Sequence, residues 1–191
     1  MGFAPALGQR HVEGARLVPG RAALLSLLPT SAIVCEVGVW EGEFSRRILD
    51  IARPSRLDLI DMELHRVDRS AFAQELSEGR VVLHEVLKEL LHEGDSAERL
   101  GAFPDATFDW IYVDADHRLE GVRRDVAVAR RKVKPDGWLV FNDYIRWTRR
   151  DTEYGVMPAV NALMVEDGWR IIYIALSESG YHDVALRRIA P

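Results

Sequence analysis

The chain has 191 residues, 48% of them hydrophobic and 29% charged, so it is long and apolar enough to bury a core without disulfides. Lys and Arg total 25 against 30 Asp and Glu, and the net charge of −5 argues against a surface made to bind nucleic acid or anionic membranes. The single cysteine, Cys35, excludes an internal disulfide. No apolar stretch approaches the ~20 residues of a membrane span, and we expect a cytoplasmic protein.

Apolar runs alternate with amphipathic segments along the chain. Residues 1–30 predict an N-terminal arm, irregular up to a short helix, and residues 31–191 predict one domain. Short runs rich in Val, Ile and Leu indicate strands, and apolar positions three or four residues apart indicate helices. In chain order we expect a helix over 21–28, a strand over 32–37, a helix over 44–52, strands over 57–62 and 109–113, a helix over 119–133, a strand over 138–141, a helix over 156–166, and strands over 169–176 and 181–188.

Two similar segments compete for the third strand, residues 81–86 and residues 89–93. We favour the second, because Gly94-Asp95-Ser96 follows it as a strand-to-helix turn. On this reading, Asp95 and Ser96 lie at the ligand edge of the sheet and can reach an adenine ring.

Strands that alternate with helices specify an α/β sheet with helices on both faces. The last two strands are joined only by residues 177–180, too few for a crossover, so they pair antiparallel. We therefore expect a Rossmann-like, doubly wound and mostly parallel sheet that ends in an antiparallel hairpin.

The loop after the first strand carries Gly38 and Gly42 and leads into a helix. A glycine loop at this place marks a ligand site at the carboxyl edge of an open sheet. Trp40 stands where the dinucleotide fingerprint needs a glycine against the pyrophosphate, and Glu36 and Glu41 add negative charge there. NAD is therefore disfavoured, and a ligand with an adenosine diol and an ammonium group but no phosphate fits better.

Asp61 ends the second strand 23 residues after Gly38, close to the spacing at which an acid meets an adenosine ribose. The ordered set resembles the class I S-adenosylmethionine-dependent methyltransferases, whose first motif, acid-x-Gly-x-x-x-Gly, matches Glu36, Gly38 and Gly42. The turn at 133–137 is similar to the one before that family's fifth strand. The resemblance implies a seven-stranded sheet of order 3-2-1-4-5-7-6 and S-adenosylmethionine as cofactor. The cofactor-binding residues that we assign are Glu36, Gly38, Trp40, Gly42, Ser45, Asp61, Met62, Asp95, Ser96 and Asp114.

A second acidic cluster follows the fourth and fifth strands, where Asp114 ends one and Asn142 and Asp143 end the next. Neighbouring strands lie about 5 Å apart, so the three side chains would share one small volume whose oxygens suit Mg²⁺. The pattern is similar to that of the cation-dependent O-methyltransferases, which implies Asp114, Asn142 and Asp143 as metal ligands. The plant-type enzymes have the pair in the order Asp-Asn, and the order here is closer to the macrolide-sugar branch. Solvated strand-end acids without a metal are the alternative.

His117 falls where relatives of the catechol type place a lysine base, and a neutral imidazole can accept a hydroxyl proton. Its alternative role is to cap the following helix. The arginines on the outer face of the 119–133 helix favour a solvated face over an RNA-binding stripe.

The leading hypothesis is a methyltransferase that acts on a small molecule, most simply a hydroxyl, with His117, Asp114 and Asp143 as the catalytic set and Mg²⁺ as a candidate second cofactor. One alternative is a non-catalytic domain that binds an adenosine ligand. Another is a metal-independent methyltransferase acting on nitrogen, protein or RNA. A second copy of the chain is a candidate partner, whereas membranes and nucleic acid are not expected.

Overall fold

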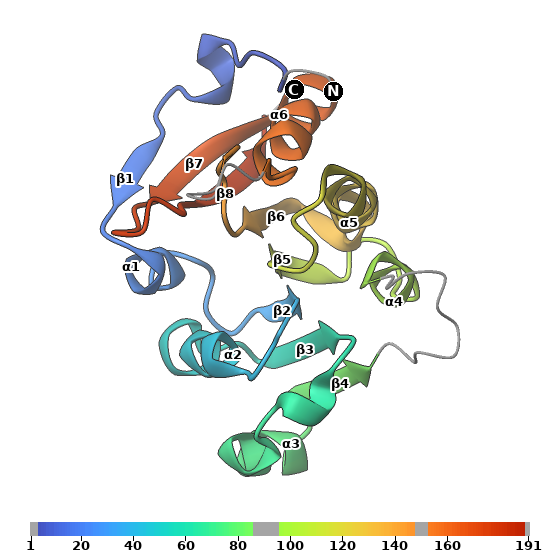
Figure 1. The fold of residues 1–191 in the computed structure, drawn as a ribbon. Coiled ribbons are helices and arrows are strands. Elements are labelled where there is room, and N and C mark those ends of the chain that lie inside the picture. Colours follow the sequence, from blue (N-terminus) through green and yellow to red (C-terminus); the bar gives the residue numbers. More distant parts are fainter. Residues whose placement is uncertain (1–3, 86–95, 148–152, 190–191) are drawn as a thin grey trace.

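The computed structural model describes residues 4–85, 96–147 and 153–189, and eight strands within them form one mixed sheet (Figure 1). The strand order is β1-β7-β8-β6-β5-β2-β3-β4. Only β8 runs antiparallel to its neighbours among these paired strands. The strands are β1 (Arg16–Val18), β2 (Ile33–Val37), β3 (Arg56–Asp61), β4 (Val81–Glu85), β5 (Phe108–Val113), β6 (Val133–Phe141), β7 (Trp169–Ala175) and β8 (Asp183–Arg188).

Strands β4, β3, β2, β5, β6, β8 and β7 have the order 3-2-1-4-5-7-6 that the sequence implies, so the doubly wound α/β class is confirmed. The expected count of seven strands was wrong by one, because β1 of the N-terminal arm pairs in parallel with β7. This strand spans only Arg16–Val18 and has a single buried residue, too little to produce a visible period-2 pattern. Pairing with the edge of β7 satisfies its main-chain groups.

The third parallel strand is β4, so the preference for residues 89–93 was wrong. Residues 86–95, with Asp95, lie outside the described residues. Strand β4 pairs with β3 in the register Leu57↔Val81, and both of these side chains are buried in one core cluster. Three short segments between β3 and β4 were not expected: the 3-10 turns η3 (Leu64–Arg66) and η4 (Arg69–Phe72) and the helix α3 (Ala73–Ser77).

Helices cover both faces of the sheet (Figure 1). On one face, α1 and α2 with its π-helical continuation η2 pack over buried side chains such as Leu24 and Ile48. On the other, α4, α5 and α6 pack over a second cluster that contains Leu100, Val126 and Met164. The remaining helical segments are η1 (Gln9–His11), α1 (Arg21–Leu25), α2 (Glu43–Arg47), η2 (Ile48–Ala52), α4 (Ser96–Gly101), α5 (Leu119–Lys132) and α6 (Val156–Asp167).

Two boundaries differ from the expectation. Helix α1 ends at Leu25 rather than at residue 28. Strand β6 begins at Val133, so the expected turn at 135–137 lies inside the strand. The pairing with β5 shifts register there, between the pairs Phe108↔Val133 and Trp110↔Trp138. The fixed φ and missing N–H of proline interrupt pairing without ending the strand.

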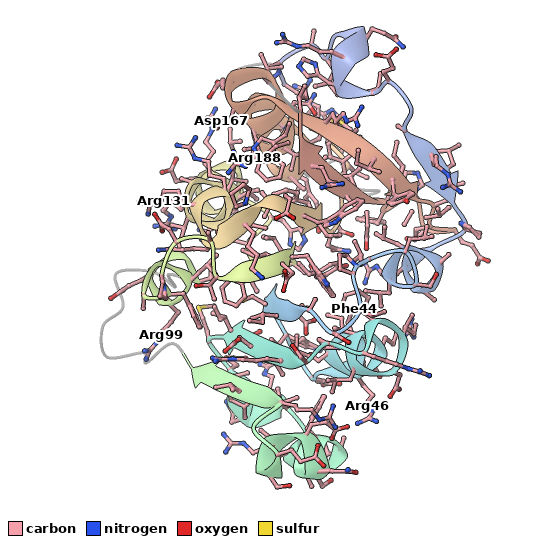
Figure 2. The ribbon with its side chains drawn as sticks, turned by 180° about the vertical axis from the view of Figure 1, so that it is seen from behind. Phe44, Arg46, Arg99, Arg131, Asp167 and Arg188 are labelled. Carbon is pink, nitrogen blue, oxygen red and sulfur yellow. The ribbon has the colours of Figure 1, made fainter. Side chains whose placement is uncertain are left out.

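Two cations of α5 have acidic partners; Figure 2 labels one of these partners, Asp167, together with Arg131 of α5. Arg130 pairs with Asp167 at 2.5 Å, and Lys132 pairs with Asp105 at 2.7 Å. Arg130 agrees with a solvated helix face, whereas Lys132 is 5% exposed and was wrongly placed on that face. Within the residues described, no helix has the length and apolar character needed to cross a membrane.

Candidate functional site

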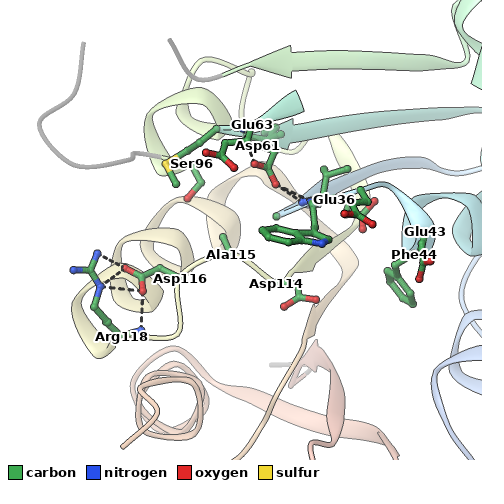
Figure 3. A pocket seen from close by; sticks show the side chains of 16 residues that line it. Glu36, Glu43, Phe44, Asp61, Glu63, Ser96, Asp114, Ala115, Asp116 and Arg118 are labelled. Carbon is green, nitrogen blue, oxygen red and sulfur yellow. Dashed lines mark hydrogen bonds and ion pairs between the residues drawn. The ribbon is translucent and has the colours of Figure 1, made fainter. Parts of the chain in front are cut away.

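A cavity of about 790 Å³ opens at the carboxyl ends of β2, β3 and β5 (Figure 3). Strand β2 lies between β3 and β5, so the chain order reverses here, and open α/β sheets bind ligands at such a reversal. Seven of the predicted cofactor residues line its wall: Glu36, Gly38, Trp40, Asp61, Met62, Ser96 and Asp114.

Gly38 is the point at which the glycine loop crosses the end of β5. Its φ is +89°, and a Cβ added there would lie 2.1 Å from the main-chain oxygen of Asp114. The Gly38 N–H donates to Ile60 O at 2.9 Å, and the Asp114 N–H donates to Val37 O at 2.7 Å. A side chain at Gly38 would therefore separate strands whose ends are hydrogen-bonded together.

Asp61 holds the glycine loop in place. Its Oδ2 accepts from the main-chain N–H groups of Val39 at 2.6 Å and Trp40 at 3.0 Å, and its Oδ1 accepts from Glu63 N at 2.8 Å. A carboxylate has about four lone-pair sites, and three of them are used here, so Oδ1 keeps capacity for a ligand hydroxyl. Asp61 thus has a structural role that the sequence did not indicate, beside the ligand-binding role that we assigned to it.

Glu36 is 1% exposed and accepts a short hydrogen bond from the Ser45 hydroxyl. Burial raises the pKa of Glu36 to about 8, because the Ser45 hydrogen bond only partly offsets the loss of solvation and the nearby Asp114 and Asp61 repel its charge. Ser45 itself is fully buried and is not part of the cavity wall. It therefore positions Glu36, and the direct ligand contact expected for Ser45 is not supported by its location.

The remaining predicted cofactor residues fall into different places. Trp40 is 62% exposed at the mouth of the cavity, with the Arg66 guanidinium 4.2 Å from its ring centre. Met62 also lines the wall, as does Ser96, whose hydroxyl donates to Asp125 at 2.6 Å. Gly42 precedes α2 with φ +86° and lies outside the wall.

Beside the cavity, His117 stands between two carboxylates. Its Nε2 lies 3.6 Å from Asp114 Oδ1 and 3.4 Å from Asp143 Oδ2. Burial lowers the pKa of His117, but the hydrogen bond to Asp143 and the charge of Asp114 outweigh burial and leave that pKa raised. The His117 ring stacks on Tyr154, with centroids 4.7 Å apart. The structure therefore brings together the three residues of the predicted catalytic set. The alternative that His117 caps the following helix is not supported, because the N-cap of α5 is Arg118 and no side chain caps it.

Asp114 belongs both to the cofactor cavity, whose wall it lines, and to the cluster around His117, which it faces. Burial raises the pKa of Asp114 to about 7, and the neighbouring Asp143 and Asp183 add to this, whereas His117 and Arg21 oppose it.

Three residues of this region were missed by sequence reasoning. Asp183, at the start of β8, is 1% exposed and accepts from the Tyr112 hydroxyl at 2.8 Å. It also lies 3.2 Å from Arg21 Nε, at the start of α1. No local motif marks Arg21, Tyr112 or Asp183, since they come from distant elements and meet only after the sheet is assembled.

In this structure the proposed Mg²⁺ ligands contact other side chains. The Asn142 amide nitrogen donates to Asp183 Oδ1 at 3.0 Å, and His117 interacts with the same amide side chain. Arg21 Nη2 lies 3.9 Å from Asp143 Oδ1, and His117 approaches the other Asp143 oxygen. Nowhere in the described residues do three or more His, Cys, Asp or Glu side chains group as a metal site. Side-chain cations thus stand where Mg²⁺ was expected.

Comparison with known proteins agrees with the fold. A family model described as a methyltransferase domain matches residues 35–144. Among curated proteins, none matches this sequence. In structure, the chain is similar to an O-methyltransferase from Bacillus cereus in complex with S-adenosylhomocysteine, at 15% identity and a TM-score of 0.64, over 87% of this chain and 78% of that one.

Two further structures show the same fold. One is 1,6-didemethyltoxoflavin-N1-methyltransferase of Burkholderia thailandensis, with 15% identity, a TM-score of 0.58, and coverage of 88% of this chain and 76% of that one. The other is the pyocyanin biosynthetic protein PhzM, with 17% identity and a TM-score of 0.61; 88% of this chain aligns, but it spans only 54% of that protein.

The fold and its cavity define a class I S-adenosylmethionine-dependent methyltransferase. Because the family model covers more than half of the sequence, the chain belongs to the methyltransferase domain family.

Proposed function

We propose that the protein transfers the methyl group of S-adenosylmethionine to a hydroxyl group of a small molecule. The observation that supports this most is the position of His117, whose Nε2 lies 3.4 Å from Asp143 and 3.6 Å from the Asp114 carboxylate, which itself lines the cofactor cavity. A base at this place can take a proton from an acceptor that lies next to the cofactor. When bound, the cofactor supplies an electrophilic methyl group on a sulfonium.

The residues on the glycine-loop side would bind the cofactor. The Glu36 carboxyl suits the ammonium of the methionine part, and Asp61 suits the ribose hydroxyls. Gly38 lets the main chain approach closely, and Ser96 lies in the wall where an adenine edge would be read. Deprotonation of Glu36 on binding would couple its raised pKa to cofactor affinity.

On the acceptor side, the protein's own contribution is alignment and proton removal. Methyl transfer is an in-line displacement, so a fixed acceptor oxygen lowers the barrier through positioning. His117 would take the hydroxyl proton at the ring nitrogen that does not donate to Asp143, and Asp143, which faces Nε2 at 3.4 Å, would stabilise the imidazolium that forms. Tyr154 holds the imidazole plane by stacking on it.

Acceptor specificity would come from two segments that border this cluster. The N-terminal arm, residues 1–30, brings Arg21 to the edge of the acceptor side. The described part of the loop after β6 brings Tyr154, whose ring also meets Tyr181 at a centroid distance of 6.2 Å. An acceptor would therefore meet aromatic rings as well as charged groups.

The test uses the purified chain with isotopically labelled S-adenosylmethionine and matched panels of phenols, sugar alcohols and amines. We expect S-adenosylhomocysteine to bind in calorimetry and label to appear on oxygen. Label on nitrogen alone would overturn the hydroxyl assignment. Binding without transfer to any panel would favour a non-catalytic adenosine-ligand domain, and absence of binding would overturn the cofactor assignment.

A further inference from the structure

Three carboxylates meet at the acceptor end of the sheet, each at the end of a different strand. Asp114 follows β5, Asp143 follows β6 and Asp183 begins β8. Strands β5, β6 and β8 are neighbours in the sheet, so their ends lie side by side. The Asp143 and Asp183 side chains are 14% and 1% exposed. Buried carboxylates at neighbouring strand ends repel one another unless a cation compensates their charge.

Arg21 supplies that compensation from outside the sheet. Its Nε lies 3.2 Å from Asp183 Oδ2, and its Nη2 lies 3.9 Å from Asp143 Oδ1, so one guanidinium spans two of the carboxylates. The same guanidinium sits 5.5 Å from the ring centre of Phe44, which lines the cofactor cavity. Arg21 is therefore held between the cofactor cavity and the carboxylates.

The neutral partners leave little room for another ligand at Asp183. Its Oδ1 accepts from the Asn142 amide at 3.0 Å, and its Oδ2 accepts from the buried Tyr112 hydroxyl as well as facing Arg21. His117 supplies the second cation when it is protonated, between Asp114 and Asp143. Every carboxylate of the cluster thus has a cationic side chain within 4 Å.

We propose that Arg21 is the built-in counter-cation of the acceptor site, so that its three aspartates work without a divalent metal ion. The inference rests on the proposed placement of acceptor chemistry at His117. Arg21 acts as a positioning residue: by neutralising Asp143 and Asp183, it keeps Asp143 oriented toward His117. An arginine suits this task because its guanidinium is always charged and presents several donors in a fixed plane.

The first experiment measures cation binding without any methyl acceptor. The full-length chain, stripped of metal by a chelator, is titrated with Mn²⁺ in a calorimeter and melted with and without millimolar Mg²⁺. We expect no saturable Mn²⁺ binding and no shift in Tm for the natural sequence. Saturable binding that Asp143→Asn removes would overturn the proposal.

The second experiment removes the guanidinium. For Arg21→Met we expect a Tm lower by roughly 3–8 °C, and a gain of saturable Mn²⁺ binding that recovers part of the lost Tm. The double variant Arg21→Met/Asp143→Asn should lose that gain. Arg21→Lys keeps the charge and should show no metal response, while Arg47→Met, on the exposed face of α2, should resemble the natural sequence.

A folded Arg21→Met protein that gains no metal response would overturn the proposal, because the cluster would then not depend on Arg21 for its charge balance. If Arg21→Met does not fold, the titration of the natural sequence and of Arg21→Lys still decides. Failure of methyl transfer would overturn the proposed function, but it would not change the result of the cation titrations, which use no methyl acceptor. Metal binding by the natural sequence would overturn only the inference that Arg21 takes the place of a metal ion.

Discussion

The glycine-loop side of the cavity and the cluster around His117 are built in different ways. On the first side, main-chain hydrogen bonds from Gly38 and Asp114 tie neighbouring strands together, and one carboxylate, Asp61, holds the loop. On the second side, main-chain hydrogen bonds such as Asn142 N–H to Val113 O at 3.0 Å also join the strand ends, but the charged side chains from α1, β8 and the ends of β5 and β6 are held chiefly by one another. The first arrangement depends on backbone shape and the second on charge balance, so different substitutions should break each.

The largest effect should come from the glycine loop. Gly38→Ala places a Cβ against the Asp114 main chain and should cost about 3–5 kcal/mol of unfolding free energy and abolish cofactor binding. Gly79→Ala is the control, because Gly79 also has positive φ, +69°, but nothing within 4 Å of an added Cβ. It should cost about 1–2 kcal/mol. Urea unfolding and calorimetry with S-adenosylhomocysteine measure both, and equal losses would mean that the close approach is unimportant.

On the other side, His117→Gln should remove the base and leave the cofactor site intact. We expect a loss of about 10²–10⁴-fold in kcat, with the Kd for S-adenosylhomocysteine changed by no more than a few-fold. His65→Gln is the matched control, since His65 is exposed on η3. A kcat close to that of the control would remove His117 from the mechanism.

The raised pKa of the buried Glu36 should make the free energy of unfolding depend on pH. Its pKa is about 8 in the folded protein against 4.5 for the free group, so the folded state holds a proton that the unfolded state releases. The unfolding free energy should therefore fall as pH rises from about 4.5 to about 8, by an amount on the order of a few kcal/mol at most. Thermal melts across this range test it. Glu36→Gln should flatten the fall, whereas Glu41→Gln, on the exposed part of the same loop, should keep it.

Asp61→Asn sharpens the distinction between holding the loop and binding the ribose. Loss of charge-assisted hydrogen bonds worth about 1.5–3 kcal/mol should weaken S-adenosylhomocysteine binding roughly 10–100-fold. The control is Asp68→Asn, because Asp68 also accepts from a main-chain N–H, that of Ser70 at 3.0 Å, away from the cavity. If both variants keep full affinity, Asp61 acts on the loop alone.

The smallest effect concerns the pH dependence of turnover. A base must be neutral, so the rate should rise with pH through the raised pKa of His117 and then level off. Asp143→Asn removes a hydrogen bond and a charge that raise this pKa, so the rising limb should move to lower pH. A limb that stays in place in the kcat profile would show that another group titrates.

The sequence by itself determined the place and type of six of the seven expected strands and the cofactor edge of the sheet, and the family resemblance implied the strand order. Runs such as Ile33–Val37 show their burial locally, and Glu36, Gly38 and Asp61 sit at fixed places after those runs, where parallel strands end together. It also indicated Asp114, His117 and Asp143, since each follows a readable strand.

Only the tertiary structure decided the rest. Strand β1 gains its hydrogen bonds from the edge of β7, and β4 is selected by pairing with β3 rather than by its own composition. Arg21 and Asp183 are 162 positions apart in the sequence, yet they form an ion pair, and the same guanidinium lies 3.9 Å from Asp143, one of the expected Mg²⁺ ligands. Charge compensation depends on distances between groups in space, and no local pattern of residues records those distances.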